Sequence, residues 1–188
     1  MMKNICLGDS LTAGYHVRPE EGWVTLLGRE TPDTWINAGV SGDTSAGMMV
    51  RLLTEVFPQK PDRVLYMGGD NDILVTGSLD QAKSSLMSIL HLCVDREIRP
   101  VIGIPIPILD IPQPWQAICD PQKAQALSRQ YIHWLREFTA ALSLRRVDFA
   151  SAFCAAPELR VLYLPDGMHP SPLGHRLMAD TVIHTMYR

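Results

Sequence analysis

The sequence lacks long hydrophobic runs and has no excess of positive charge. Its apolar segments are short and end at charged residues, glycine or proline, so no membrane-spanning helix is expected. Lysine and arginine total 17 against 20 aspartates and glutamates, which gives a formal net charge of −3. Proteins that bind nucleic acid need a basic surface, so we expect no nucleic-acid partner.

The N-terminus also lacks a secretory signal. Lys3 is followed by only a short apolar stretch before Gly8 and Asp9 interrupt it. We therefore expect a cytoplasmic protein, unless a leader has been removed from the sequence.

The four cysteines show no paired spacing of the kind that binds zinc. Each lies in or near an apolar run, which favours reduced thiols. We expect no metal site and no cofactor.

The composition is that of an ordinary globular protein, with 46% hydrophobic and 20% charged residues in a chain of 188. This length fits one domain over residues 1–188. Short β-like runs rich in Val, Ile and Leu alternate with helical segments, which predicts a parallel sheet covered on both faces. We expect an α/β fold, a three-layer α/β/α sandwich of flavodoxin-like character. Its five strands are predicted at Asn4–Leu7, Thr34–Asn37, Arg63–Met67, Pro100–Ile104 and Arg146–Phe149.

Two of the predicted helices carry start signals. Residues 78–81, Ser-Leu-Asp-Gln, have the spacing of a capping box ahead of an apolar periodic segment. Ser171 is the expected N-cap of the last helix, with Pro172 in its first turn. That helix is expected to present Leu173, Leu177 and Thr181 to the core.

A serine lies where ligands are expected in such a fold. In open α/β sheets, ligands bind beyond the carboxyl ends of the strands, and Ser10 follows the first predicted strand in "GDS". An isolated Gly-Asp-Ser is ordinary turn chemistry. Near the other end of the chain, however, "LPDGMHPSPLGH" places Asp166 three residues before His169. A serine nucleophile needs an imidazole to take its proton and a carboxylate to orient the imidazole, so these three residues form a candidate triad.

Two further loops offer hydrogen-bond donors for an oxyanion. Gly39 in "INAGVSG" lacks a side chain, so its backbone N–H could approach a substrate closely. Asn71 in "MGGDNDI" carries an amide that donates without transferring a proton. Taken singly, each is also compatible with an ordinary turn residue.

Together these segments resemble the four blocks of the GDSL, or SGNH, hydrolase family. The blocks are "GDSLTAG", "NAGVSGDT", "GGDND" and "DGMHPSPLGH", in that order, between residues 8 and 175. The resemblance implies that Ser10 is the nucleophile, His169 the general base and Asp166 its partner. It also implies an oxyanion hole formed by Ser10 N–H, Gly39 N–H and the Asn71 amide, and metal-free hydrolysis of esters or thioesters through an acyl-enzyme.

Within that family, "RPEEGWVTLL" is most similar to the small bacterial arylesterase and lysophospholipase-thioesterase branch. The expected partner is a small-molecule ester. Leu11, the Thr44–Val50 region and the proline-rich segment around Trp115 are expected to form largely apolar pocket walls. A carbohydrate acetyl-esterase of the same fold is the alternative.

One position departs from the family pattern. Asp70 stands where the family often has a small or hydroxylated residue, and with Asp9 and Asp72 it could raise a pKa or attract a cation. We expect instead that Asp70 points to solvent and that Asp72 accepts local backbone hydrogen bonds. A metal-dependent phosphoesterase and a non-catalytic binding protein are the more distant alternatives.

Overall fold

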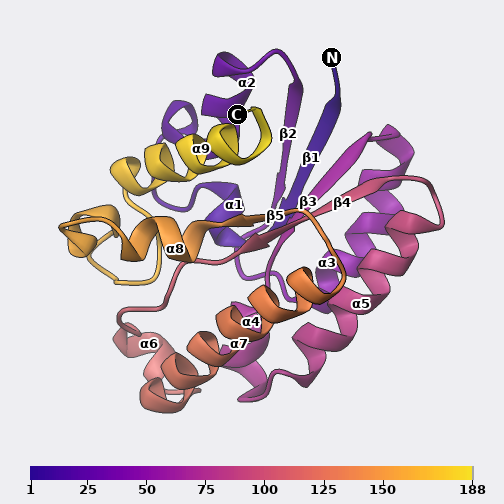
Figure 1. The fold of residues 1–188 in the computed structure, drawn as a ribbon. Helices are drawn as coiled ribbons and strands as arrows, with labels where there is room; N and C mark the ends of the chain where they lie inside the picture. The colour runs from indigo at the N-terminus through magenta and orange to yellow at the C-terminus, as the bar shows by residue number, and fades with distance from the viewer. Residues whose placement is uncertain (188) are drawn as a thin grey trace.

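Five parallel strands form one sheet in the order β2-β1-β3-β4-β5 (Figure 1). The computed structural model describes residues 1–187. All five predicted strands are present, and the α/β prediction is confirmed. The strands are β1 (Lys3–Gly8), β2 (Thr34–Gly39), β3 (Arg63–Met67), β4 (Arg99–Ile104) and β5 (Arg146–Asp148).

Helices cover both faces of the sheet. In Figure 1, α2, α8 and α9 lie on one face, and α3, α4, α5 and α7 lie on the other. The helices are α1 (Ser10–Ala13), α2 (Trp23–Glu30), α3 (Ser45–Arg51), α4 (Asp70–Thr76), α5 (Asp80–Val94), α6 (Gln113–Gln116), α7 (Pro121–Ala141), α8 (Phe149–Cys154) and α9 (Pro172–Tyr187). Short 3₁₀ or π turns cover Pro19–Glu21, Leu52–Val56, Phe57–Gln59 and Leu159–Leu162.

The interior strand β1, between β2 and β3, is buried on both faces, which explains its nearly continuous apolar sequence. Ile5 and Leu7 belong to the core under α3, α5 and α7, whereas Cys6 belongs to the core under α2, α8 and α9. Side chains of successive strand residues point to opposite faces, so both layers pack on the same strand. The carboxyl end of β1 is therefore held firmly from both sides.

Two details predicted from the sequence, a capping box at residues 78–81 and a strand end at Phe149, are wrong. Ser78 Oγ accepts from Asp80 N–H, but Gln81 donates its side-chain amide to Ser85, so no capping box forms. Phe149 begins α8 rather than ending β5, because the Asp148 carboxylate accepts from Ser151 N–H and caps the helix.

The N-cap predicted for α9 is confirmed, but its buried face is rotated. Ser171 Oγ accepts from Gly174 N–H at 3.2 Å. Leu173 is 61% exposed, and the core contacts come from the side that includes Gly174, Met178 and Val182. A Cβ at position 174 would clash with the Leu162 carbonyl, so the glycine lets α9 approach closely on this side.

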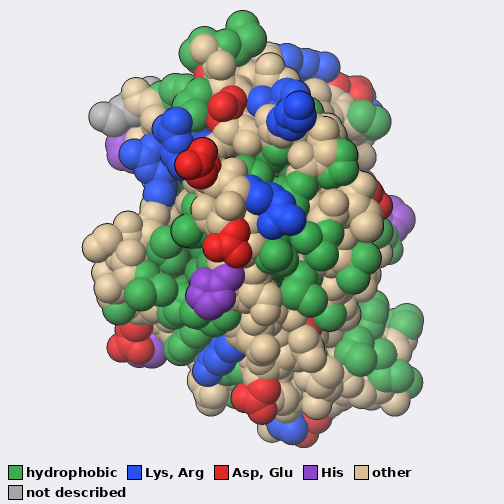
Figure 2. Space-filling view, turned by 90° about the vertical axis from the view of Figure 1, so that its right-hand side faces the viewer, with side chains coloured by type: hydrophobic (Ala, Val, Ile, Leu, Met, Phe, Trp, Pro, Cys, Tyr) green, Lys and Arg blue, Asp and Glu red, His purple; other side chains and the backbone are tan. Residues whose placement is uncertain are grey.

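The surface carries charges of both signs. Figure 2 shows Lys and Arg interspersed with Asp and Glu on the side of the molecule that lies at the right of Figure 1. Within residues 1–187, no helix has both the length and the apolarity needed to cross a bilayer.

Candidate active site

A cavity of about 220 Å³ lies where the loops after β1, β2, β3 and β4 meet. This is the edge at which parallel α/β sheets bind ligands. Its polar lining includes Asp9, Ser10, Asp70, Asn71 and His169, and its apolar lining includes Leu11, Leu74, Ile108, Trp115 and Met168.

Ser10 is the first residue of α1, immediately after the turn that ends β1. The turn is tight, because a Cβ at Gly8 would collide with the Thr12 side chain. The Asp9 carboxylate accepts from Leu11 N–H at 2.9 Å and caps α1, while Trp23 Nε1 donates to the Leu11 carbonyl at 3.0 Å. These contacts fix the backbone on which the Ser10 hydroxyl is mounted.

His169 connects Ser10 to Asp166 by two hydrogen bonds. Nε2 of His169 lies 2.9 Å from Ser10 Oγ, and Nδ1 lies 2.6 Å from Asp166 Oδ2. Nδ1 carries the proton that faces the carboxylate, so Nε2 is left to accept from the serine hydroxyl. The structure thus brings the three predicted triad residues together in the order that nucleophilic catalysis requires.

The loop that carries His169 is held by its own backbone. Asp166 Oδ1 accepts from the N–H groups of Met168 and His169, at 2.9 and 3.0 Å. Partial burial opposes ionisation of Asp166, but these bonds and the one from the imidazole hold its pKa below the usual range. The carboxylate is therefore charged at neutral pH and can stabilise an imidazolium at His169.

Tyr15 was not identified from the sequence as part of this site. Its ring lies 4.4 Å from the His169 ring, centroid to centroid, and it lines the cavity. It sits five residues after Ser10, just beyond the C-cap glycine of α1. Only the tertiary fold brings it against the imidazole, so no local pattern marks it.

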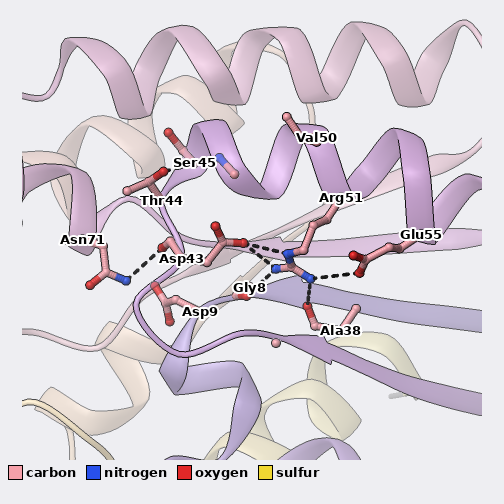
Figure 3. Close-up of polar contacts among 12 residues, drawn as sticks. Gly8, Asp9, Ala38, Asp43, Thr44, Ser45, Val50, Arg51, Glu55 and Asn71 are labelled. Atoms are coloured by element: carbon pink, nitrogen blue, oxygen red, sulfur yellow. Dashed lines mark hydrogen bonds and ion pairs between the residues drawn. The ribbon is translucent and has the colours of Figure 1, made fainter.

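Asn71 lines the cavity at the start of α4, as the oxyanion prediction requires. Its Nδ2 donates to the Asp43 carbonyl at 2.9 Å (Figure 3). A primary amide carries two N–H donors, so the second remains for a ligand. The Ser10 N–H is also available, since it belongs to the first turn of α1 and has no acceptor within residues 1–187.

The structure corrects the assignment of Gly39. Its N–H donates to Asn37 Oδ1 at 2.9 Å, and Gly39 is absent from the cavity lining. Gly39 is the last residue of β2, paired with Gly8, and it lacks a side chain because a Cβ would collide with the Ala13 backbone. Its smallness serves packing rather than catalysis.

Gly42, three residues further on, occupies the position expected of a backbone donor. It lines the cavity, adopts φ +80°, and its N–H has no acceptor in the part of the chain that the structure describes. The positive φ explains why glycine stands there. Gly42 is the second glycine of "NAGVSGDT" and lies beyond the end of the strand. This position after the strand could have identified it in the sequence as the candidate oxyanion donor.

The prediction that Asp70 points to solvent is wrong. Asp70 is 8% exposed and lines the cavity, and its Oδ1 accepts from Ser128 Oγ of α7 at 3.3 Å. Gly69, with φ +120°, turns the chain so that Asp70 enters α4 facing α7. Burial raises the pKa of Asp70 to about 7. The hydrogen bond from Ser128 lowers this pKa and the charge of Asp72 raises it, but both effects are smaller than that of burial.

The other two aspartates of this group have structural partners. Asp72 accepts from the Ser45 N–H and hydroxyl, at 2.9 and 2.7 Å, and so joins α4 to α3. Burial, and next the charge of Asp70, raise the pKa of Asp9 to about 8. In the described chain, no cluster of three or more His, Cys, Asp and Glu side chains is arranged to hold a metal ion.

The apolar walls only partly match their prediction. Leu11 and Trp115 line the cavity, as expected, but the Thr44–Val50 region does not. That region forms most of α3, whose Met48 is fully buried against the sheet core. Leu74 of α4, Ile108 of the proline-rich segment and Met168 of the His169 loop supply further apolar surface.

The proline-rich loop is fastened directly to the His169 loop. The N–H groups of Leu109 and Asp110 donate to the Gly167 carbonyl at 2.9 and 3.2 Å. Arg160 pairs with the Asp110 carboxylate at 2.5 Å and donates to the Pro165 carbonyl at 2.9 Å. The loop that carries Ile108 therefore shares hydrogen bonds with the loop that carries the imidazole.

The chain matches a known protein family over most of its length. The GDSL-like Lipase/Acylhydrolase family matches residues 6–177. Esterase TesA of Pseudomonas aeruginosa is 35% identical over 89 residues, and Thioesterase 1/protease 1/lysophospholipase L1 of Escherichia coli K12 is 36% identical over 93 residues. These alignments cover 45% and 46% of this chain, and 44% and 43% of the relatives, so they span less than half of each protein.

A solved structure shows the same fold along the entire chain. A member of the lipolytic protein G-D-S-L family from Veillonella parvula superimposes with a TM-score of 0.85. The superposition covers 100% of both chains at 23% sequence identity.

Proposed function

Because this chain belongs to the GDSL-like lipase/acylhydrolase family, we propose that it is a serine esterase that cleaves carboxylic esters through an acyl-enzyme. One observation carries the proposal. A continuous chain of hydrogen bonds runs from Asp166 through His169 to Ser10 Oγ, which faces the cavity.

In the first step, Ser10 Oγ attacks the ester carbonyl carbon while its proton passes to His169 Nε2. The imidazolium that forms is stabilised by the Asp166 carboxylate. Negative charge develops on the carbonyl oxygen, where the N–H groups of Ser10, Gly42 and Asn71 are the donors we assign to it. Collapse of this intermediate breaks the bond to the alkoxy group, which takes the proton from Nε2 and leaves as an alcohol.

In the second step, water replaces the alcohol. His169 Nε2 accepts a proton from the water as its oxygen attacks the acyl carbon. The bond between the acyl carbon and Ser10 Oγ then breaks, Oγ takes the proton back from His169 Nε2, and the carboxylic acid is released. The free enzyme is regenerated with Ser10 and His169 in their starting states.

The cavity favours a small hydrophobic acyl or aryl group. Its walls of Leu11, Leu74, Ile108 and Trp115 are apolar, and its volume of about 220 Å³ is modest. Pockets for drug-sized ligands typically reach about 300–1,000 Å³, so a long acyl chain would extend beyond this cavity. We therefore propose short acyl and aryl esters as the preferred substrates.

The test is hydrolysis of p-nitrophenyl esters from acetate to palmitate by the wild type and by Ser10→Ala. Acyl-thioesters, a lysophospholipid and acetylated sugars extend the panel to the neighbouring substrate classes. Loss of the serine of a triad costs about 10⁶-fold in kcat. We expect a loss of that order without a change in the melting temperature, because Ser10 lies at the surface of the cavity rather than in the core.

A fluorophosphonate probe provides an independent check, and it should label the wild type but not Ser10→Ala. Near-native kcat in Ser10→Ala would show that the nucleophile is another residue. Loss of activity on addition of a chelator would instead favour a metal-dependent hydrolase.

A further inference from the structure

The loop after β2 supplies two groups to the oxyanion region. Gly42 lines the cavity, and the neighbouring Asp43 carbonyl accepts from Asn71 Nδ2 at 2.9 Å. The Asn71 amide is bonded to the Asp43 carbonyl, and the Gly42 N–H belongs to the residue next to Asp43, so both donors lie on or against the same short stretch of backbone. The positions of both donors therefore depend on what holds Asp43.

Arg51, at the end of α3, holds Asp43 by its side chain. Its Nε and one terminal nitrogen lie 2.8 and 2.7 Å from Asp43 Oδ2 (Figure 3). Both side chains are largely buried, with 13% and 12% of their surface exposed. A Cβ at Gly47 would clash with the Asp43 carboxylate, so the start of α3 is shaped to admit this ion pair.

The same guanidinium also binds the ends of two strands. It donates to the Ala38 carbonyl of β2 at 2.7 Å and to the Gly8 carbonyl of β1 at 3.1 Å. Gly8 is two residues before Ser10, so one planar group ties the segment that carries the nucleophile to the loop that carries the oxyanion donors. The fork geometry of arginine suits several acceptors in one plane, which an ammonium group cannot reproduce.

A buried ion pair of this kind contributes little net stability, since desolvation offsets much of the attraction. The contacts of Arg51 do fix the Asp43 carboxylate relative to the ends of β1 and β2. We infer that Arg51 is a positioning residue of the oxyanion hole, acting through Asp43 on Asn71 and Gly42. This inference rests on the proposed esterase function, but its structural part is testable without turnover.

The variants are Arg51→Met, which keeps the aliphatic stem, Arg51→Lys, which keeps the charge, and Asp43→Asn, which keeps the backbone carbonyl. Arg136→Met is the matched control, because Arg136 makes a comparable two-nitrogen pair with Asp148 at 2.7 and 3.1 Å, away from the cavity lining. The readouts are kcat and KM for a p-nitrophenyl ester and the melting temperature.

We expect Arg51→Met and Asp43→Asn to lower kcat by about 10²-fold, as for loss of one oxyanion donor, with KM changed less than about threefold. Arg51→Lys should recover part of kcat, and Arg136→Met should retain it. In an Asn71→Ala background, Arg51→Met should cause a smaller further loss than it causes in the wild type, because only its effect on Gly42 remains. Equal losses in Arg51→Met and Arg136→Met, or fully additive losses with Asn71→Ala, would overturn the inference.

An NMR measurement separates this inference from the proposed function. The side-chain amide signal of Asn71, assigned by its disappearance in Asn71→Ala, should shift in Arg51→Lys and Asp43→Asn but not in Arg136→Met. Failure of the wild type to cleave any ester would refute the function and leave this result standing. An unchanged Asn71 signal would refute the positioning role whatever the activity.

Discussion

The loop that carries His169 and the loop that carries Gly42 flank the same cavity, but contacts of different range hold them. Asp166 binds the backbone and ring of a residue three positions away, within one turn. Asp43, in contrast, depends on Arg51 eight residues later, and Asn71 meets Asp43 across 28 residues of chain.

This difference separates two kinds of contribution to the same reaction. In the proposed mechanism, the His169 loop carries the proton transfer, which requires the correct tautomer of the imidazole. The Gly42 loop would supply hydrogen bonds to the developing charge, and loss of one such bond lowers the rate only in part. Three substitutions probe the difference, in decreasing order of expected effect.

Asp166→Asn should have the largest effect of the three. The Met168 and His169 N–H groups that now bind Oδ1 of Asp166 would bind the side-chain amide oxygen in the variant. The new amide N–H₂ would then face His169 Nδ1 and force the proton onto Nε2, where the ring cannot accept from Ser10. Such a tautomer error costs about 10⁴-fold in kcat.

Steady-state kinetics of Asp166→Asn with a p-nitrophenyl ester provide the measurement, and melting temperature is the control for folding. A loss no larger than that of Asn71→Ala would show that the two loops contribute in the same graded manner.

Asn71→Ala should have the intermediate effect. Removing one oxyanion donor typically lowers kcat by about 10²–10³-fold, and KM should change little because the hydrogen bond strengthens only as charge develops. The Ser10–His169 bond does not involve Asn71, so labelling of Ser10 by a fluorophosphonate should persist in part. Complete loss of labelling would place Asn71 with the triad rather than with the Gly42 loop.

Asp70→Asn should have the smallest effect on turnover, within a few-fold, but a distinct effect on stability. The pKa of Asp70 is raised to about 7 by burial, whereas the unfolded value is about 3.9. Between these values the folded state keeps a proton that the unfolded state releases. The free energy of unfolding of the wild type should therefore fall as pH rises from about 4 to 7.

Urea unfolding of the wild type and Asp70→Asn at pH 5 and pH 8 tests this expectation. The variant should lose less stability between the two pH values, while the exposed Asp95→Asn should behave like the wild type. Identical pH dependence in all three proteins would show that Asp70 ionises as an ordinary aspartate. If Asp70→Asn abolished turnover and Asn71→Ala did not, the alternative of a metal-dependent phosphoesterase that uses the carboxylates would be favoured.

The sequence predicted what depends on local pattern. Strand β3 was predicted with its observed bounds, and the Ser171 cap was correct, because apolar runs and capping residues act on their own neighbours. The triad could be proposed because Asp166 and His169 lie in one turn, and because Ser10 follows a strand that ends at the edge where ligands bind.

The errors in the site, unlike the local ones at residues 78–81 and at Phe149, concern contacts between distant segments. In the sequence, Gly39 and Gly42 both lie in the loop predicted after the second strand. Only the pairing of β2 with β1 shows that Gly39 belongs to the strand, where the Ala13 backbone leaves no room for a side chain. The burial of Asp70 depends on α7, whose Ser128 is 58 residues away along the chain. His175, fully buried with Nδ1 3.4 Å from the Trp23 N–H, was not singled out because its partner is 152 residues distant.

The hydrogen bonds between the proline-rich loop and the His169 loop have a consequence for altering substrate range. A backbone shift at Leu109 or Asp110 would be passed to Gly167, two residues before His169, because their N–H groups are bonded to its carbonyl. Leu74 lines the same cavity from α4, and Trp115 lines it from α6 without taking part in these hydrogen bonds. Substitutions at these two positions are therefore expected to change selectivity with less effect on the proton-transfer geometry.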